Sequence, residues 1–479
     1  MNGMPLSPVR VGIFGIGLAA YWPQFPSLRD RLEGYQRTIV ERLHTLGATV
    51  IDAGLVDNVS RAHEAGELFA KERVSLVFCY VGTYATSSIV LPVVQRANCP
   101  TLVLNLQPVA ALDYPNTDTA EWLANCCTCC VPEISCAFAR ARVPFQVVSG
   151  ILFGDERVWQ EIMEWIQAAR VRNTLRDVRI GFLGHTYPGM LDLYSDFTRI
   201  QAQLGVHVEI LEMEDLQTRI DAVDERDIAS KIEEIKGTFE IAEPGRDRIS
   251  QPISDQALRW TAKVACGLDR LVNDFGLGGL SYYYRGWNEN EFEKICASMI
   301  VGSSLLTARG VPVAGEGDLK TCIAMKIMDL LGCGGSFTEF YAMDFNESFI
   351  LMGHDGPGDI AISQGKPLLR GLSLYHGKRG YGISVEFNVR LGLVTILGIT
   401  ETADGRLKFL LAEGESIAGE RLQIGNTNSR IRFSLRPADF VNAWCTEGPT
   451  HHVALGVGHQ ASVLRKVARL LNCELVVVG

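Results

Sequence analysis

Four short segments of this chain carry the side chains best suited to chemistry. Residues 311–321 read V-P-V-A-G-E-G-D-L-K-T and place Glu316 between two glycines. The other three segments are S-F-T-E-F-Y with Glu339, L-M-G-H with His354, and G-P-T-H-H with His451 and His452. Two carboxylates and imidazole make a mixed oxygen and nitrogen donor set, which suits Mn²⁺, Mg²⁺ or Co²⁺ better than a thiolate site would. Together the segments predict one divalent metal centre, with either histidine of the pair as a ligand.

The surrounding residues predict a turn at Glu316. Residues 311–314 are apolar enough for a short strand, and Asp318 is suited to cap a helix over residues 319–331. This order puts Glu316 at the carboxyl end of a strand, where α/β proteins hold their ligands. A single glutamate in a turn is more often solvated than functional. It is the grouping with the other segments that favours a functional site.

Composition narrows the class of protein. The chain has 479 residues, of which 47% are hydrophobic and 21% charged, as in a globular protein of several domains. The net charge of −10, with no basic stripe, argues against a nucleic-acid partner. No apolar run reaches the length of a membrane span, and residues 1–10 lack the apolar core of a secretory signal. We therefore expect a cytoplasmic protein with no membrane partner.

Five of the thirteen cysteines lie close together in the sequence. Four form the segment C-C-T-C-C, from Cys126 to Cys130, and the fifth is Cys136. The segment contains two overlapping C-x-x-C spacings. A zinc or iron–sulfur site would need further ligands from a second spaced pair, and the sequence has none. We therefore favour a helix start with small, soft side chains near a pocket, and expect thiols rather than disulfides.

The order of predicted elements indicates an α/β protein with three domains, at residues 1–175, 176–333 and 334–479. The first two each alternate strands with helices, which is typical of a doubly wound parallel sheet. The third shows short alternating runs between turns, which predict an antiparallel β-barrel-like domain. Predicted strands lie at residues 9–16, 49–53, 75–80, 101–106, 178–184, 206–211, 279–284, 349–352, 382–389, 393–400, 407–413, 421–424, 430–435 and 474–478. Predicted helices include residues 27–46, 62–72, 89–97, 159–171, 197–204, 221–239, 254–275, 291–308 and 461–471.

The first domain offers candidate substrate contacts. Thr83 and Gln107 lie in polar loops after its third and fourth strands, at the edge where an open sheet binds its ligand. A nicotinamide site is disfavoured, because the glycines of the first turn are spaced G-x-x-G-x-G rather than G-x-G-x-x-G. Asp52 comes near the position of a ribose contact without occupying it cleanly.

The four segments closely resemble the motifs of L-arabinose isomerases. Residues 313–321 resemble the family's A-G-E-G-D-W-K-T, and residues 336–341 resemble S-F-M-E-D-Y. Residues 351–354 resemble L-G-S-H, and residues 444–452 resemble W-x-x-A-G-G-A-H-H, in the same order and at similar separations. The resemblance is specific in the last 170 or so residues. In the first 300 residues it lies in the order of predicted elements more than in the amino acids themselves.

This resemblance implies two α/β domains followed by a β-barrel-like domain, and aldose–ketose isomerisation with a divalent metal, usually Mn²⁺. The ligands it implies are Glu316, Glu339, His354 and His452, with both glutamates doubling as acid/base groups. It also implies a trimer-based homo-oligomer, typically a hexamer, whose pockets are completed by a neighbouring subunit.

The pocket walls depart from the family pattern. Where the family has a histidine within N-Q-T-A-H-G-G, residues 125–133 read N-C-C-T-C-C-V-P-E, and the family's F-T-T-T-F becomes L-S-Y-Y-Y at residues 280–284. We therefore expect a sugar other than L-arabinose. Its candidate contacts are His185, Tyr187, Tyr284 and His451; the alternative for the first three is a residue of the pocket rim or the core.

Two other functions compete with isomerisation. A non-catalytic sugar-binding or regulatory relative would not need paired carboxylates and both imidazoles. A nicotinamide-linked oxidoreductase would need the glycine pattern that is absent. We therefore predict an aldose–ketose isomerase acting on a small sugar through a cis-enediolate.

Overall fold

The computed structural model describes residues 9–479 except 244, 246–250, 286–289, 372–373, 376–377 and 380–382. The chain divides into two compact units, one ending at Asn173 and the other running from Thr174 to Gly479. The predicted division into three domains stays a prediction. Within the described parts of the chain, no helix has the length and hydropathy needed to cross a membrane.

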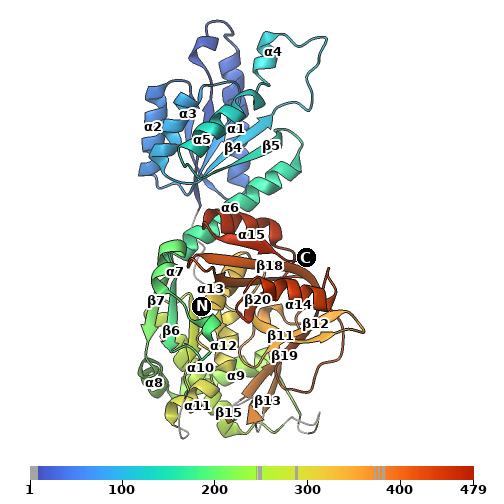
Figure 1. The fold of residues 1–479 in the computed structure, drawn as a ribbon. Coiled ribbons are helices and arrows are strands. Elements are labelled where there is room, and N and C mark those ends of the chain that lie inside the picture. Colours follow the sequence, from blue (N-terminus) through green and yellow to red (C-terminus); the bar gives the residue numbers. More distant parts are fainter. Residues whose placement is uncertain are drawn as a thin grey trace. The chain divides into compact units, whose positions relative to one another are not determined.

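The first unit is a five-stranded parallel sheet flanked by helices, as the strand–helix alternation predicts. Its strand order is β2-β1-β3-β4-β5, and every pairing is parallel. Helices α2, α3 and α5 lie side by side over one face (Figure 1), where Phe69 and Phe138 are fully buried in a common core. The strands are β1 (Arg10–Ile16), β2 (Thr49–Val56), β3 (Leu76–Tyr80), β4 (Thr101–Gln107) and β5 (Phe145–Ile151). The helices are α1 (Leu28–Thr45), α2 (Val59–Lys71), α3 (Ser87–Ala97), α4 (Thr119–Leu123) and α5 (Val131–Arg140).

Helix α6 (Glu156–Asp177) is longer than predicted. The helix was predicted to end at residue 171, but residues 172–177 continue it. The reason is the buried spacing of Val171, Thr174 and Leu175, which are each no more than 1% exposed and extend the apolar stripe of the helix.

The second unit begins with another parallel sheet, of order β10-β9-β6-β7. Its strands are β6 (Arg179–Gly184), β7 (His207–Leu211), β9 (Gly279–Tyr283) and β10 (Val313–Ala314). Its helices are α7 (Phe197–Leu204), α8 (Met213–Asp221), α9 (Glu225–Thr238), α10 (Asp255–Phe275), α11 (Glu291–Ala297) and α12 (Ile300–Thr307). The helix predicted over residues 291–308 is therefore two helices. Helix α9 lies within the helix predicted over residues 221–239. One side of it is buried, because Ile228 and Ile235 pack against α10.

The C-terminal part is a mixed sheet of order β17-β20-β11-β12-β19-β18-β21, in which β17 also pairs with β18. Strand β21 pairs in parallel with β18, against the antiparallel expectation, because helix α15 carries the chain back across the sheet. Residues 421–424 form no strand. Barrel closure stays a prediction. The strands are β11 (Ser336–Asp344), β12 (Phe349–His354), β17 (Gly392–Glu401), β18 (Leu407–Ile417), β19 (Thr427–Phe433), β20 (His452–Val457) and β21 (Glu474–Val477), and the helices are α14 (Pro437–Thr446) and α15 (Ala461–Leu470).

Two small sheets complete the described strands. One joins β8 (Glu240–Ile241), β13 (Leu368–Gly371) and β16 (Ile383–Glu386), and the other pairs β14 (Leu374–Tyr375) with β15 (Lys378–Arg379). Residue 382 of the strand predicted over residues 382–389 lies outside the described residues.

Helix α13 (Leu319–Leu330) joins the parallel and mixed sheets of the second unit. It packs against β9 and β10 on one side and against β17 and β20 on the other. Every residue from Leu319 to Met328 is buried, as expected for a helix enclosed on all sides. Its two buried lysines are satisfied, since Lys320 Nζ donates to Tyr194 O and Lys326 Nζ to Gly310 O, both at 2.7 Å. Helix α13 therefore fixes the end of β10 relative to the mixed sheet.

The aromatic packing of α14 yields the first prediction. The ring of Phe440 is fully buried and stacks on Phe433 with centroids 3.8 Å apart. Phe440→Ala should lower the free energy of unfolding by about 3–5 kcal/mol, because it removes buried apolar surface and leaves a cavity. Chemical denaturation measures this loss. Phe345→Ala is the matched control: that ring is 69% exposed, so its loss should change stability by less than about 0.5 kcal/mol. Equal effects of the two variants would contradict this view of the core.

Candidate metal centre and active site

The Glu316 turn has an unusual backbone that the structure holds in place. Glu316 has φ +58° and Gly317 has φ +68°, so a non-glycine residue adopts the left-handed conformation, at a cost of about 1–2 kcal/mol. Two hydrogen bonds fix it: Gly317 N donates to Tyr282 O and Tyr187 N donates to Glu316 O, both at 2.9 Å. A Cβ on Gly317 would lie 2.5 Å from the carbonyl oxygen of His185. Strain held this firmly is typical of functional sites.

Asp318 links this turn to His452. As predicted, Asp318 caps helix α13, accepting from Thr321 N through Oδ1 at 2.9 Å. Its other oxygen, Oδ2, lies 3.0 Å from His452 Nδ1, and both side chains are fully buried. Burial raises the pKa of Asp318, but the hydrogen bonds from His452 and Thr321 outweigh it and leave the pKa lowered. An ionised Asp318 accepts a hydrogen bond from Nδ1–H of His452, which leaves the lone pair of the imidazole on Nε2.

The Nε2 atom of His452 faces two other donor side chains. It lies 3.2 Å from His354 Nε2 and 3.6 Å from Glu316 Oε2. The ring of Phe337 packs against both imidazoles, with centroids 4.4 Å from His354 and 4.2 Å from His452. The structure thus brings together three of the four predicted ligands from β10–α13, β12 and β20.

Glu339 lies on the strand between the two histidine strands. In the register of β11 it is directly opposite His452 on β20 and Gly353, the neighbour of His354, on β12. Residues directly opposite each other in antiparallel strands share a face, so Glu339 and His452 project from the same side of the sheet. Glu339 is half-buried. Its carboxylate is not one of the three donors that lie closest together.

His451 occupies the rim of the same cluster. Its Nδ1 lies 2.6 Å from Asp192 Oδ2, its backbone N–H donates to the same oxygen, and its Nε2 lies 3.6 Å from Glu316 Oε2. Burial lowers the pKa of His451, but the hydrogen bonds to Glu316 and Asp192 raise it overall to about 9. Glu316, His451 and His452 together form a group whose donor atoms all lie within 4.8 Å of one another.

These spacings fit a divalent ion. Ligands about 2.1 Å from a metal in tetrahedral or octahedral geometry lie roughly 3.0–3.5 Å from one another. The separations of 3.2 and 3.6 Å from His452 Nε2 to His354 and Glu316 are close to that range. The donor chemistry, imidazole nitrogen with carboxylate oxygen, is that of Mn²⁺, Co²⁺ or Zn²⁺ sites. The residues present are therefore suitable metal ligands.

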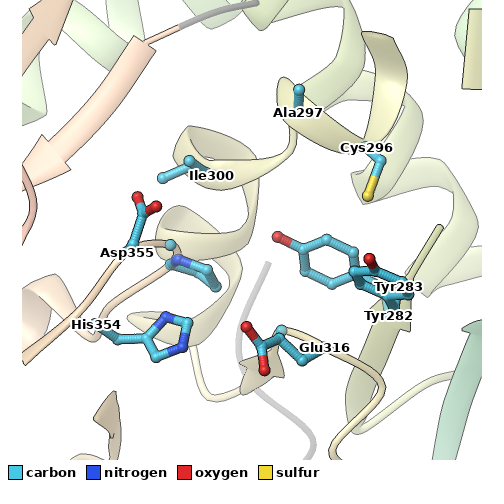
Figure 2. A pocket seen from close by; sticks show the side chains of 11 residues that line it. Tyr282, Tyr283, Cys296, Ala297, Ile300, Glu316, His354 and Asp355 are labelled. Atoms are coloured by element: carbon cyan, nitrogen blue, oxygen red, sulfur yellow. The ribbon is translucent and has the colours of Figure 1, made fainter. Parts of the chain in front are cut away.

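A small cavity opens beside the cluster (Figure 2). Figure 2 shows the Glu316 carboxylate and the His354 imidazole side by side, with Asp355 next to His354 and the rings of Tyr282 and Tyr283 beyond Glu316. Cys296, Ala297 and Ile300, from α11 and the start of α12, line the opposite wall. A polar ligand in this cavity would have the predicted metal ligands on one side and aromatic rings on another.

The predicted substrate contacts of the second unit lie near this cavity. His185 packs its ring against Tyr283 and Tyr284, with centroids 5.3 and 6.3 Å apart, and Tyr187 lies 4.6 Å from Tyr283. The backbone of the same loop pins the Glu316 turn. The loop after β6 therefore holds the Glu316 turn through its backbone, independently of any contact between its side chains and a substrate.

Two further predicted substrate contacts, Thr83 and Gln107, belong to the first unit. Thr83 is fully buried, and the Gln107 amide donates to Val109 O at 2.6 Å. Their role toward a substrate stays a prediction. Asp52 accepts from Gln36 Nε2 at 2.5 Å and from Gly54 N at 2.8 Å, so it is engaged in structural hydrogen bonds rather than presented to a ribose.

Two functional partners were not foreseen from the sequence. Asp318 was expected only as a helix cap. Its position two residues after Glu316 could have indicated that it also belongs to the site. Asp192 gave no signal, because it lies 259 residues from His451 in sequence. Both are carboxylates that orient a histidine.

Comparisons with known proteins show which family this chain resembles. Family models described as the L-arabinose isomerase central domain and the L-arabinose isomerase C-terminal domain match residues 195–334 and 334–474. An L-arabinose isomerase from Nocardioides sp. is 24% identical over 412 residues, covering 84% of this chain and 80% of the relative. L-Arabinose isomerase 1 from Bacillus licheniformis is 22% identical, covering 88% of this chain and 84% of the relative. A sulfoquinovose isomerase from Priestia aryabhattai is 23% identical, covering 69% of this chain and 71% of the relative.

The two matched domains include Glu316, His354 and His452, the three predicted ligands that the structure brings together. These relatives match the chain over long stretches at low identity. The chain is therefore a divergent member of the L-arabinose isomerase family and an aldose–ketose isomerase.

Proposed function

We propose that this enzyme interconverts an aldose and a ketose through a cis-enediolate, and that it depends on a divalent metal. The observation that carries the proposal is the convergence of Glu316, His354 and His452 at one point, with Glu339 opposite His452 on the adjacent strand. Isomerisation needs a base beside the reacting carbon and stabilisation of negative charge on two neighbouring oxygens. This donor set is suited to both tasks.

Glu316, Glu339, His354 and His452 would hold the ion. Mn²⁺ is the metal we favour, with Mg²⁺ and Co²⁺ as alternatives. The ion would supply Lewis-acid stabilisation of charge that develops on adjacent sugar oxygens. Of the two neighbouring histidines, we favour His452, because Asp318 directs its Nε2 lone pair at His354 and Glu316. His451 is then a candidate substrate contact at the rim, held by Asp192.

The two glutamates divide the proton transfers. One carboxylate removes the proton from C2 of the aldose and returns it to C1 of the enediolate, so the carbonyl moves from C1 to C2. The other carries the proton between the two hydroxyl oxygens. The held backbone of Glu316 keeps its carboxylate in one place, which favours proton transfer to a fixed position. Either glutamate is compatible with either role.

The substrate is proposed to be a sugar other than L-arabinose. Tyr282 and Tyr283 line the cavity, in a segment that departs from the family pattern. Relatives named for L-arabinose and for sulfoquinovose show that proteins similar to this chain act on different sugars. The trimer-based homo-oligomer, typically a hexamer, and the cytoplasmic location stay predictions from the sequence.

Hydrogen exchange with solvent tests the reaction directly. The metal-loaded enzyme, incubated in D₂O with a panel of aldoses and ketoses, should place deuterium on the carbon next to the carbonyl of its substrate. Glu316→Gln should slow this exchange by at least about 10²–10⁴-fold, because the amide can neither accept the proton nor bind the metal as an anion. Glu347→Gln, a change at an exposed carboxylate between β11 and β12, is the matched control and should exchange normally.

Other outcomes would be equally informative. Tight sugar binding without exchange on any sugar would favour a non-catalytic sugar-binding relative instead. Normal exchange by the Glu316→Gln variant would remove Glu316 from the mechanism.

The tautomer of His452 yields a separate prediction. In Asp318→Asn, the amide oxygen can still accept from Thr321 N, but the amide N–H₂ then faces His452 Nδ1. His452 must move its proton to Nε2, so metal affinity should fall about 10–100-fold. Titration calorimetry with Mn²⁺ measures this loss. Asparagine is also a good helix cap, so the fold should persist.

Asp192→Asn is the matched control, because Asp192 orients His451 in the same way. If His452 is the ligand, this variant should bind Mn²⁺ with nearly unchanged affinity. A larger loss in Asp192→Asn than in Asp318→Asn would instead assign the metal to His451.

A further inference from the structure

A pair of thiols outside the metal centre lies in the turn that precedes helix α5. Cys126 and Cys129 are three residues apart, and their Sγ atoms are only 2.7 Å from each other. They need to approach by only about 0.7 Å to reach the S–S bond length of about 2.05 Å. Cys126 is 7% exposed, whereas Cys129 is open to solvent. One thiol is thus accessible to a reagent and the other lies behind it.

The turn is seated on the carboxyl end of the first unit's sheet. Thr128 Oγ1 donates to Asn105 Oδ1 at 3.2 Å, and Cys127 Sγ donates to Leu106 O at 3.6 Å. Both acceptors are residues of β4. Cys129 Sγ also lies 3.1 Å from Cys126 O, so the two cysteines are held in one helical turn. The close approach of the sulfurs therefore belongs to an anchored segment.

Metal binding is a weaker explanation of this arrangement. The neighbouring thiols turn away, because Cys127 faces Leu106 O and Cys130 faces Thr83 O. Within the described ranges, Glu316, His451 and His452 are the only group of three or more histidine, cysteine or acidic side chains close enough to hold an ion. Two sulfurs alone do not complete a zinc or iron–sulfur site.

We propose that Cys126 and Cys129 are a reversible dithiol–disulfide pair, oxidised by a low-molecular-weight disulfide. The thiolate of Cys129 attacks one sulfur of the oxidant, forming a mixed disulfide and releasing one small thiol. Cys126, after losing its proton, attacks Cys129 Sγ and releases the second small thiol. The protein loses two hydrogens and two electrons, and the oxidant is reduced to two thiols.

The buried position of Cys126 suits the second step. Burial and the contact with Cys129 together raise the pKa of Cys126 to about 12, so this thiol is a poor nucleophile toward outside reagents. It attacks only when Cys129 already carries the mixed disulfide beside it. Once formed, the bond fixes residues 126–129 as a closed loop over β4. Reduction by a dithiol reverses it.

Thiol mapping of the full-length protein tests the proposal. The chain is treated with oxidised glutathione, the remaining thiols are alkylated, and the peptides are analysed by mass spectrometry. We expect a Cys126–Cys129 disulfide that dithiothreitol removes. In Cys126→Ser, Cys129 should instead stop as a stable glutathione adduct. Cys136→Ser removes another exposed thiol, of α5, and should leave the Cys126–Cys129 bond unaffected.

Three results would overturn the proposal. Cys126 and Cys129 could both stay alkylatable under these conditions, or wild-type Cys129 could stop at the glutathione adduct. A disulfide from either cysteine to a different partner would also contradict it. None of these outcomes bears on the metal centre, so the two proposals stand or fall separately.

Discussion

The hydrogen bond between Asp318 and His452 is the interaction on which the rest of the site depends. One buried carboxylate caps helix α13 through Oδ1 and holds His452 through Oδ2. Helix α13 is enclosed by the parallel sheet and the mixed sheet of the second unit. The Asp318 carboxylate therefore joins the end of β10 to the start of β20. Because the buried pair keeps the Nε2 lone pair of His452 directed at Glu316 and His354, the fold itself preorganises the donor set.

The Glu316 turn shows what this preorganisation costs. A left-handed glutamate between glycines is less stable than an ordinary turn by about 1–2 kcal/mol. Backbone hydrogen bonds from Gly317 and Tyr187 hold it, and the loop after β6 also reaches His451 through Asp192 and Lys320 through Tyr194. The aromatic residues of this loop thus have a structural role in addition to any contact with the sugar.

Much of the architecture follows from local pattern, and most of the site's geometry does not. The strand–helix alternation of the first unit and the Asp318 cap were predicted because both depend on neighbouring residues. The positive φ of Glu316 and the Asp192–His451 contact were not, because they depend on packing between distant segments. The helix predicted over residues 159–171 runs on to Asp177, because buried Leu175 continues its apolar stripe. No strand was predicted at His452, yet it begins β20, where pairing with β11 places it opposite Glu339.

Anomalous X-ray diffraction from crystals of the full chain soaked in Mn²⁺ would show which side chains bind the metal. We predict one strong anomalous peak within about 2.0–2.3 Å of the carboxylates of Glu316 and Glu339 and of the Nε2 atoms of His354 and His452. His452 Nδ1 should remain bonded to Asp318 in that structure. A peak coordinated by His451 in place of His452, or no peak between the sheets, would contradict this account.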